Sequence, residues 1–361
     1  MASPVYTNPA FAEHWKMALL KRKGQKPARI VIVSGSLSEM ISYGGCTKSW
    51  CDMLGDRIFI PTSAEWGLGT NGNGADFWNP TKSTSGSFYV TAEVGNHSPV
   101  RKGTATAGGF IEWDVTEYHR VRPLIVKASW TGHPVVSIDD STPITTDAMN
   151  WTVWDPSGIS QNTILGPAFD VTAASSFKLI KPSVADLIVH GIVVDKTLNT
   201  EIQVLNLSRS GTTSAQWGTW FEPARDGDES MIELTRGFNH DLVAFGSWGN
   251  DFHEGVNQST LNSRLDALYA RLQVLCPNAD FFTWNEPPAV DPNDPSFETA
   301  WNTFNQWIRD WNEANDIPYS DWGAYMPTSG IHNEYYGSDQ THGNVAFSQL
   351  IADDSAEIVL P

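Results

Sequence analysis

Hydrophobic residues recur along this chain with two different periods, and the change between them divides the chain into three stretches. In residues 1–60 and 186–361, short apolar runs alternate with segments whose apolar residues lie three and four positions apart. Residues 61–185 instead contain short runs in which apolar and polar residues alternate one by one. The first pattern is typical of α/β folds with a parallel sheet, and the second is typical of antiparallel sheets.

The first stretch begins as a helix followed by a strand and a second helix. Asn8-Pro9 precedes apolar residues at helical spacing and predicts a capped helix that ends near Gly24. The apolar run Ile30–Val33 predicts a buried strand, and residues 48–58 return to helical spacing. A strand followed by a helix is the opening unit of a parallel sheet.

The middle stretch contains runs such as "SGSFYVTAEV", "GGFIEWDV" and "HPVVSIDDS", which are separated by Gly, Pro, Asn and Asp. They predict an antiparallel β-sandwich or jelly roll inserted into the α/β part. Six tryptophans of this stretch fit either core packing or a carbohydrate-binding face, because indoles serve both roles: Trp66, Trp78, Trp113, Trp130, Trp151 and Trp154.

The last stretch resumes the α/β pattern. Strands are expected in "TEIQVLNLSRSG", "HDLVAFGSWGND" and "ADFFTW", and a terminal helix in "THGNVAFSQLIADD". Two further helices each have an apolar stripe, made by Leu261, Leu265, Leu268, Leu272 and Leu275 in one and by Phe297, Trp301, Phe304, Ile308 and Trp311 in the other. We expect Asp294-Pro295 to cap the second of these helices.

Composition narrows the classes of partner. The chain has 23 basic and 41 acidic residues and a formal net charge of −18, which argues against nucleic acid and against an anionic membrane surface. The first residues contain no apolar signal segment, and no stretch is long enough to span a bilayer. We therefore expect synthesis in the cytosol without a signal peptide, and no membrane insertion.

The three cysteines do not form a disulfide framework. Cys46 and Cys51 are close enough in sequence for a small loop disulfide, and the sequence leaves open whether they are bonded. Cys276 follows an apolar helix and is expected to be a buried thiol.

Small polar residues follow the predicted strands, where parallel sheets collect functional groups. Ser36, Gly211 and Asn250 each follow one strand, and Asp339 and His342 lie near the end of the chain. Acyl transfer needs a nucleophilic hydroxyl, a base, an acceptor that orients the base, and donors for the oxyanion. Ser36 fits the nucleophile, His342 the base and Asp339 the orienting acceptor. The oxyanion donors would be the backbone N–H groups of Ser36 and Gly211 and the Asn250 amide.

Each residue also has a structural interpretation. Ser36, Gly211 and Asn250 are all common in turns, and Asp339 with His342 could cap the last helix. His253 and His332 are rival bases, but no Asp precedes either by three positions. No metal site or other cofactor is expected, because the chain has no H-x-x-x-H or C-x-x-C spacing, and "GTNGNG" lacks the Lys-Ser/Thr of a phosphate loop.

The blocks "SGSLS", "SRSGTTSAQW", "GSWGND" and "SDQTHGN" occur in the order of the SGNH hydrolases, also called GDSL-like esterases, which this chain resembles over residues 1–60 and 186–361. The resemblance implies a flavodoxin-like three-layer αβα fold with a central parallel sheet, interrupted by a jelly-roll-like antiparallel β-sandwich at 61–185. It also implies a metal-independent serine esterase that uses the triad and oxyanion donors named above.

Two positions depart from the family pattern. Ser34-Gly35-Ser36 stands in place of G-D-S, so the Asp before the nucleophile is absent. Trp248-Gly249-Asn250-Asp251 stands in place of G-x-N-D, which moves the glycine by one position. Trp248 is consequently expected to form a wall of the substrate pocket.

The helix before "ARIVIV", the inserted sandwich and "VLNLSRSGTTSAQW" together resemble SGNH-type minor tail proteins of actinobacterial phages. This implies a small acyl ester on a carbohydrate or cell-envelope polymer as substrate, and a virion tail as location. Other tail proteins and further copies of the chain are then candidate partners. The alternative is a tail structural or receptor-binding protein whose hydrolase site is vestigial.

Overall fold

The structure is a computed structural model. It describes residues 5–6, 15–18, 28–35, 62–64, 66–67, 81–85, 88–91, 100–103, 108–116, 118–127, 134–145, 152–153, 162–181, 187–195, 202–206, 208, 211–221, 240–246, 248–331, 334–336 and 343–359. The helix expected over residues 48–58 and the cysteines Cys46 and Cys51 lie outside these ranges.

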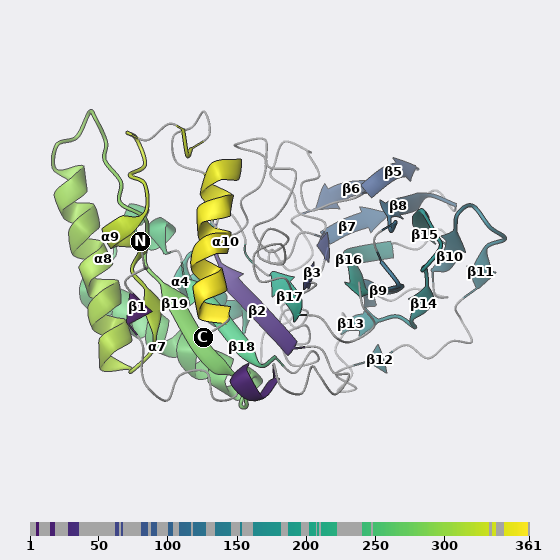
Figure 1. The fold of residues 1–361 in the computed structure, drawn as a ribbon, viewed down its shortest axis with the longest axis horizontal. Coiled ribbons are helices and arrows are strands. Elements are labelled where there is room, and N and C mark those ends of the chain that lie inside the picture. The colour runs from purple at the N-terminus through teal and green to yellow at the C-terminus, as the bar shows by residue number, and fades with distance from the viewer. Residues whose placement is uncertain are drawn as a thin grey trace.

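A seven-stranded sheet forms the centre of the α/β part (Figure 1). Its strands in spatial order are β1 Val5–Tyr6, β20 Tyr319–Ser320, β19 Asp280–Trp284, β18 Leu242–Gly246, β2 Ala28–Ser34, β17 Ile202–Asn206 and β3 Thr62–Ala64. All neighbours are parallel except β1, which pairs antiparallel with β20. We number β2, β17, β18, β19 and β20 from 1 to 5 by their order in the chain. Their order across the sheet is then 2-1-3-4-5, as in flavodoxin-like folds. The predicted fold class is therefore confirmed.

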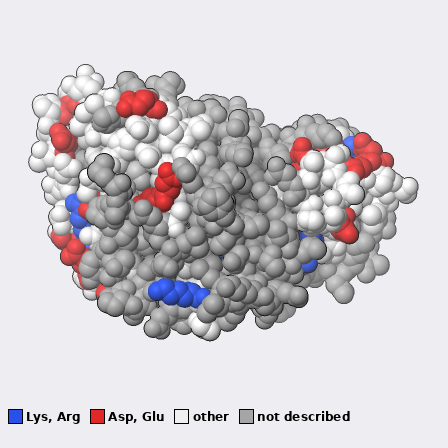
Figure 2. Space-filling view, in the orientation of Figure 1, with Lys and Arg blue, Asp and Glu red and all other residues white. Residues whose placement is uncertain are grey.

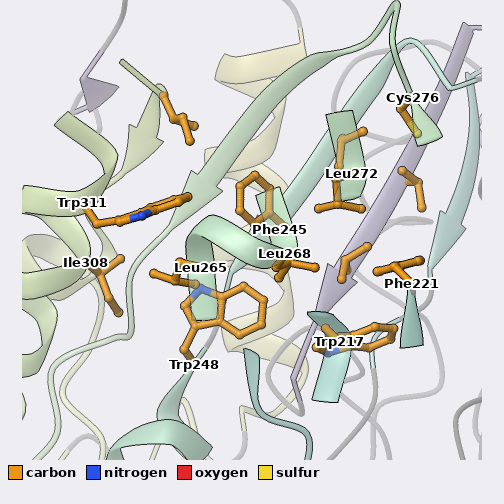
Figure 3. Close-up of a cluster of buried hydrophobic side chains, with 14 of the residues drawn as sticks. Trp217, Phe221, Phe245, Trp248, Leu265, Leu268, Leu272, Cys276, Ile308 and Trp311 are labelled. Carbon is orange, nitrogen blue, oxygen red and sulfur yellow. The ribbon is translucent and has the colours of Figure 1, made fainter. Parts of the chain in front are cut away.

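Apolar side chains cover both faces of this sheet, as a parallel sheet between helices requires. On one face, Val31 and Val33 pack with residues of three helices: α4 Ser214–Trp220, α7 Gln258–Leu275 and α8 Phe297–Ala314 (Figure 3). On the other face, Ile30 and Ile32 pack with residues of the helical segment 15–18, α9 Trp322–Tyr325 and α10 Val345–Val359. The strand alternates its side chains between two cores, which makes three layers.

The helices α7 and α8 confirm the apolar stripes read from the sequence. All five leucines of α7 are buried, and so are Trp301, Phe304, Ile308 and Trp311 of α8. Cys276, directly after α7, is buried as expected, and burial raises the pKa of its thiol to about 12.

The cap expected for α8 is wrong. The helix begins two residues later than Asp294-Pro295 predicts, with Ser296 as N-cap and Phe297 as its first residue. Asp294 Oδ1 instead accepts the Ser296 N–H at 2.9 Å and the Ser296 hydroxyl at 2.6 Å. The carboxylate therefore stabilises a turn before the helix. Short polar side chains often bind nearby backbone groups in such turns instead of capping a helix.

The middle of the chain forms two antiparallel sheets (Figure 1). One contains β5 Thr81–Ser85, β8 Phe110–Asp114, β10 Val135–Ile138, β11 Ile144–Thr145 and β15 Ser176–Ile180. The other contains β4 Trp66–Gly67, β6 Phe88–Thr91, β7 Val100–Gly103, β9 Arg120–Lys127, β12 Thr152–Val153, β13 Asn162–Leu165, β14 Phe169–Asp170 and β16 Leu187–Asp195.

One hydrophobic core joins the two antiparallel sheets. Trp113 and Phe177 of the first sheet pack in the same cluster as Val121 and Ile192 of the second. Trp113 is fully buried there, which fits its interpretation as a core residue. Of the other five tryptophans, Trp66 is described in its backbone only and the rest lie outside the described residues. The division of the chain at 61–185 and the jelly-roll topology stay predictions.

On the described surface, acidic side chains outnumber basic ones in the view of Figure 2. In the view of Figure 2, red acidic side chains are spread over the α/β part and over the antiparallel sheets, with fewer blue basic ones. This distribution agrees with the net charge of −18. Among the helices in the described ranges, none combines the length and the apolar character that crossing a bilayer requires.

Candidate active site

The predicted site residues fall into two groups. Gly211, Trp248 and Asn250 belong to the described residues. The triad Ser36, Asp339 and His342 lies outside them, as does the rival base His332. The described part of the candidate site consists of the first group and of residues that adjoin the triad in the chain.

The place where β2 ends is the switch point of the sheet. Ser34, the last residue of β2, lies beside Gly246, the last residue of β18, in parallel register. The chain changes direction across the sheet here, because β17, the next of the numbered strands, lies on one side of β2, whereas β18 lies on its other side. In open α/β sheets, ligands bind in the crevice outside the carboxyl ends at such a point. Ser36 is the second residue after Ser34, and Asn250 is the fourth after Gly246.

Gly211 begins the turn that enters α4. Its φ is +76°, in the left-handed region, and a Cβ built on it would meet nothing within 4 Å. Glycine is favoured there because the left-handed region is strained for other residues. The open space on its Cβ side leaves this backbone accessible to a bound molecule.

The residues after Gly211 fix the turn. Thr213 caps α4 in a reciprocal box with Gln216: its N–H donates to Gln216 Oε1 at 2.8 Å, and its hydroxyl accepts the Gln216 N–H at 3.4 Å. Thr212 is buried, and its hydroxyl accepts the Trp217 indole N–H at 3.0 Å. The sequence "TSAQ" has the spacing of such a capping box.

Asn250 lies against this turn. It is the second residue of α6 Gly249–His253, and its side-chain Nδ2 donates to the backbone oxygen of Thr212 at 2.9 Å. This is the one side-chain hydrogen bond of Asn250 within the described part of the chain, so the second N–H of the amide is available to a ligand. The structure thus places the Asn250 side chain against the turn that Gly211 begins.

Asp251 ties the same two turns together a second time. This fully buried carboxylate accepts the Ser214 N–H at 2.7 Å and the Ser214 hydroxyl at 2.8 Å, and it pairs with Arg264 at 2.7 Å. Desolvation by burial raises the pKa of Asp251, while the bonds from Ser214 and Arg264 act in the opposite direction. Asp251 is the last residue of the block "GSWGND", and the sequence alone predicted no role for it.

Glu286 is a further residue that sequence reasoning missed. It follows β19 by two positions, and it is buried, with 2 % of its surface exposed. Its Oε1 accepts the Gly249 N–H at 2.8 Å, at the residue before Asn250. The signal was available, because a polar residue at a strand end is the same clue that identified Ser36, Gly211 and Asn250.

A described segment also adjoins His342. Gly343, the next residue, forms an antiparallel bridge with Tyr336, whose hydroxyl donates to the Pro327 oxygen at 2.6 Å. Burial first, and then the negative charge of Glu286, raise the pKa of Tyr336. The bridge therefore fixes Gly343, the residue after His342, beside the buried Tyr336.

Asn344 supplies the cap of the last helix. Its Oδ1 accepts the N–H groups of Ala346 at 2.8 Å and Phe347 at 3.3 Å, at the start of α10. These are N–H groups that a capping side chain is expected to bind. The capping role considered for Asp339 and His342 is thus carried by Asn344.

Trp248 and His253 lie differently from the oxyanion donors. Trp248 is 1 % exposed and packs in the core between α7, α8 and the sheet (Figure 3). It therefore anchors the start of α6, of which it is the N-cap, to this core. Its expected role as a pocket wall stays a prediction. His253 is exposed at the end of α6, where its ring packs near Phe252 and Trp301.

Comparison with solved structures gives a match over nearly the whole chain. A peptidoglycan O-acetylesterase shares 13 % identity, with 96 % of both chains covered and a TM-score of 0.65, which shows a common fold. A family two carbohydrate esterase from Clostridium thermocellum in complex with cellohexaose shares 12 % identity over 77 % of this chain and 97 % of that one, with a TM-score of 0.34. A GDSL-like lipase from Bacteroides thetaiotaomicron shares 17 % over 43 % and 75 %, with a TM-score of 0.32. The last two scores carry no structural argument.

Sequence comparison assigns the α/β part. The comparison with curated proteins found no match. The model of the GDSL-like Lipase/Acylhydrolase family matches residues 193–350, a range that includes the Gly211 turn, α6 and Glu286. Together with the flavodoxin-like sheet, this match shows that the chain carries a domain of the GDSL-like lipase/acylhydrolase (SGNH) family, a family of esterases and acylhydrolases.

Proposed function

We propose that this protein is a serine esterase that removes a small acyl group from an alcohol by a metal-independent mechanism. The observation that carries the proposal is the contact between the Gly211 turn and Asn250 at the switch point where β2 leads toward Ser36. A backbone N–H and an amide that converge beside a strand end form a place for a developing oxyanion.

In the proposed mechanism, the Ser36 hydroxyl attacks the ester carbonyl while His342 removes its proton. Asp339 accepts from the other imidazole nitrogen and stabilises the imidazolium. The oxyanion is held by the N–H groups of Ser36 and Gly211 and by the Asn250 amide. His342 then gives its proton to the leaving alcohol. In the second half of the reaction, His342 removes a proton from water, which attacks the acyl-enzyme, and returns the proton to the Ser36 oxygen as the acid leaves.

The Gly211 turn and α6 are well suited to hold such donors rigidly. Three hydrogen bonds join them: one from Asn250 to Thr212, and two from Ser214 to Asp251. Fixed donors cost no reorganisation when charge develops, and removing one typically lowers kcat by about 10²- to 10³-fold.

For the substrate, we infer an acylated carbohydrate or cell-envelope polymer. The fold is similar over nearly the whole chain to that of a peptidoglycan O-acetylesterase, and the antiparallel sheets offer a second surface for a polymer. A place in a phage tail, beside other tail proteins or further copies of this chain, belongs to the same proposal and rests on the sequence resemblance alone.

Substitution of Ser36 tests the reaction. Ser36→Ala should abolish hydrolysis of an aryl acetate and covalent labelling by a fluorophosphonate, because both require the nucleophilic hydroxyl. Ser38→Ala, the same change two positions away, is the matched control and should retain both. Peptide mass spectrometry of the labelled wild-type protein should find the adduct on Ser36.

Two results would contradict the proposal. Undiminished turnover by Ser36→Ala would remove Ser36 as nucleophile. A wild-type protein that is neither labelled nor active would favour the alternative, a tail structural or receptor-binding protein with a vestigial site.

A further inference from the structure

Glu286 is a buried carboxylate for which the proposed reaction has so far no use. Only 2 % of its surface is exposed, and it follows β19 at the carboxyl edge of the sheet. A buried carboxylate is costly unless hydrogen bonds compensate its desolvation. What these bonds hold in place therefore indicates what the residue does.

The backbone of Glu286 is fixed to α8. Its N–H donates to Asn305 Oδ1 at 2.9 Å, and its carbonyl accepts from Asn305 Nδ2 at 3.0 Å. Asn305 is itself 1 % exposed, and the Trp301 indole N–H donates to the next residue, Pro287, at 2.7 Å. A side chain that starts from so well-anchored a backbone can position its neighbour accurately.

The neighbour is the start of α6. This helix has Trp248 as N-cap, which makes no side-chain capping bond, so the first N–H groups have no local acceptor of that kind. Glu286 Oε1 takes the Gly249 N–H at 2.8 Å in its place. Gly249 directly precedes Asn250, so the bond holds the peptide unit one residue before Asn250, whose side chain extends to Thr212.

The contact also explains the displaced glycine of this chain. A Cβ on residue 249 would lie 3.2 Å from the Trp301 ring and 3.5 Å from the Glu286 carboxyl carbon. The first distance is tighter than ordinary packing, so a side chain at 249 would require α6 or the Trp301 ring to shift by a few tenths of an ångström. Glycine at this position and the carboxylate at 286 thus belong to one arrangement.

We infer that Glu286 is a positioning residue of the proposed oxyanion hole: through the Gly249 N–H it holds α6 so that the Asn250 amide faces the Gly211 turn. The inference rests on the proposed esterase function.

Steady-state kinetics on an aryl acetate test the inference, with rates divided by the fraction of protein that a fluorophosphonate can label. Glu286→Ala should lower kcat about 10- to 100-fold, because small displacements of an oxyanion donor are that costly. KM should change less than about twofold, since Asn250 acts on the transition state rather than on bound substrate. Glu286→Gln keeps an acceptor oxygen and should recover kcat to within about threefold of wild type.

Matched variants separate positioning from a general loss of structure. Glu298→Gln changes an exposed glutamate of α8 and should have wild-type kinetics. Gly249→Ala should lower kcat as Glu286→Ala does, and the double variant should lose less than the product of the two effects, because both act through one contact. If Glu286→Ala does not fold, Gly249→Ala serves as the test on its own.

The outcomes distinguish this inference from the proposed function. An active wild type with Glu286→Ala or Gly249→Ala at the level of Glu298→Gln overturns the role of Glu286 and leaves the esterase standing. Loss of kcat without recovery in Glu286→Gln overturns the acceptor role. A wild type that shows neither turnover nor labelling overturns both.

Discussion

At the scale of single residues, Gly211 combines a conformational requirement with a chemical one. Its φ of +76° favours glycine, and the space on its Cβ side is empty. The empty space matters for the proposed reaction, because a substrate carbonyl must approach the Gly211 N–H within hydrogen-bond distance. A methyl group at this position would thus affect the backbone and the site separately.

Gly211→Ala tests this. Strain in the left-handed region should lower the free energy of unfolding by about 1–2 kcal/mol, and the methyl group should lower kcat/KM by roughly tenfold or more, a part of what loss of the donor would cost. Urea unfolding and hydrolysis of an aryl acetate measure the two effects. Gly108→Ala is the control, since Gly108 has a φ of +84° and equally open surroundings in the antiparallel sheets. If it loses as much activity as Gly211→Ala, the effect is one of stability alone.

The residues that sequence reasoning missed share a property. Ser214 and Asp251 lie 37 positions apart, as do Gly249 and Glu286. A hydrogen bond between residues so distant leaves no local pattern, whereas Gly211 and Asn250 stand in short blocks that a family resemblance can identify. Asp251 and Glu286 could have been suspected from their strand-end positions, but their partners could not.

At the scale of elements, the start of α10 is joined to the strand-like segment before it. Asn344 caps the helix through its Oδ1, and its Nδ2 donates to the Glu334 oxygen at 2.8 Å. The Asn344 N–H donates to the Tyr335 oxygen at 2.9 Å, beside the bridge between Tyr336 and Gly343. One side chain therefore connects the helix to the segment that leads into His342.

Asn344→Ala should break these side-chain bonds and lower the free energy of unfolding by about 1–2 kcal/mol, the usual cost of a lost cap. It should also lower kcat at a temperature where the protein stays folded, because the proposed base is two residues away. Asn344→Asp keeps the capping oxygen but not the donor, so it should recover most of the stability and less of the activity. Equal recovery of both would show that the segment before α10 does not depend on the donor. Thermal unfolding and steady-state rates on one preparation give the comparison.

How well the elements could be predicted follows from their length and period. The stripes of α7 and α8 extend over several turns, and every leucine of α7 is buried as its spacing requires. The strand β3, with three residues, has no period to detect, and its place in the parallel sheet was not foreseen. The cap of α8 was wrong because Asp294 and Ser296 are both good capping residues, and only the tertiary structure decides between them.

At the scale of the whole molecule, strand order could not be read from periodicity. The order 2-1-3-4-5 brings β2 next to β18 although more than two hundred residues separate them in sequence, and the long antiparallel segment intervenes. The family resemblance supplied this order, since its blocks must meet at one edge. The stretches of alternating residues indicated antiparallel strands, but not how they are divided between two sheets.

The described residues form three separate hydrophobic clusters, and this leads to a prediction about the cooperativity of unfolding. Two clusters lie on the faces of the parallel sheet, and the third joins the antiparallel sheets. Leu268→Ala should weaken the first cluster by about 2–5 kcal/mol, and Phe177→Ala the third by about 3–5 kcal/mol. Both side chains are fully buried, so both changes leave cavities.

If the predicted division at 61–185 is a folding unit, the two variants should behave differently in calorimetry combined with residual activity after heating. Leu268→Ala should lower the temperature at which aryl acetate hydrolysis is lost, because the first cluster supports α4, α7 and the core beneath α6. Phe177→Ala should lower a different transition and leave the hydrolysis midpoint within about a degree, since no described contact of that side chain reaches the parallel sheet. A single transition that both variants shift, with activity lost in parallel, would mean that the antiparallel sheets and the hydrolase fold as one cooperative unit and that the division is only one of sequence pattern.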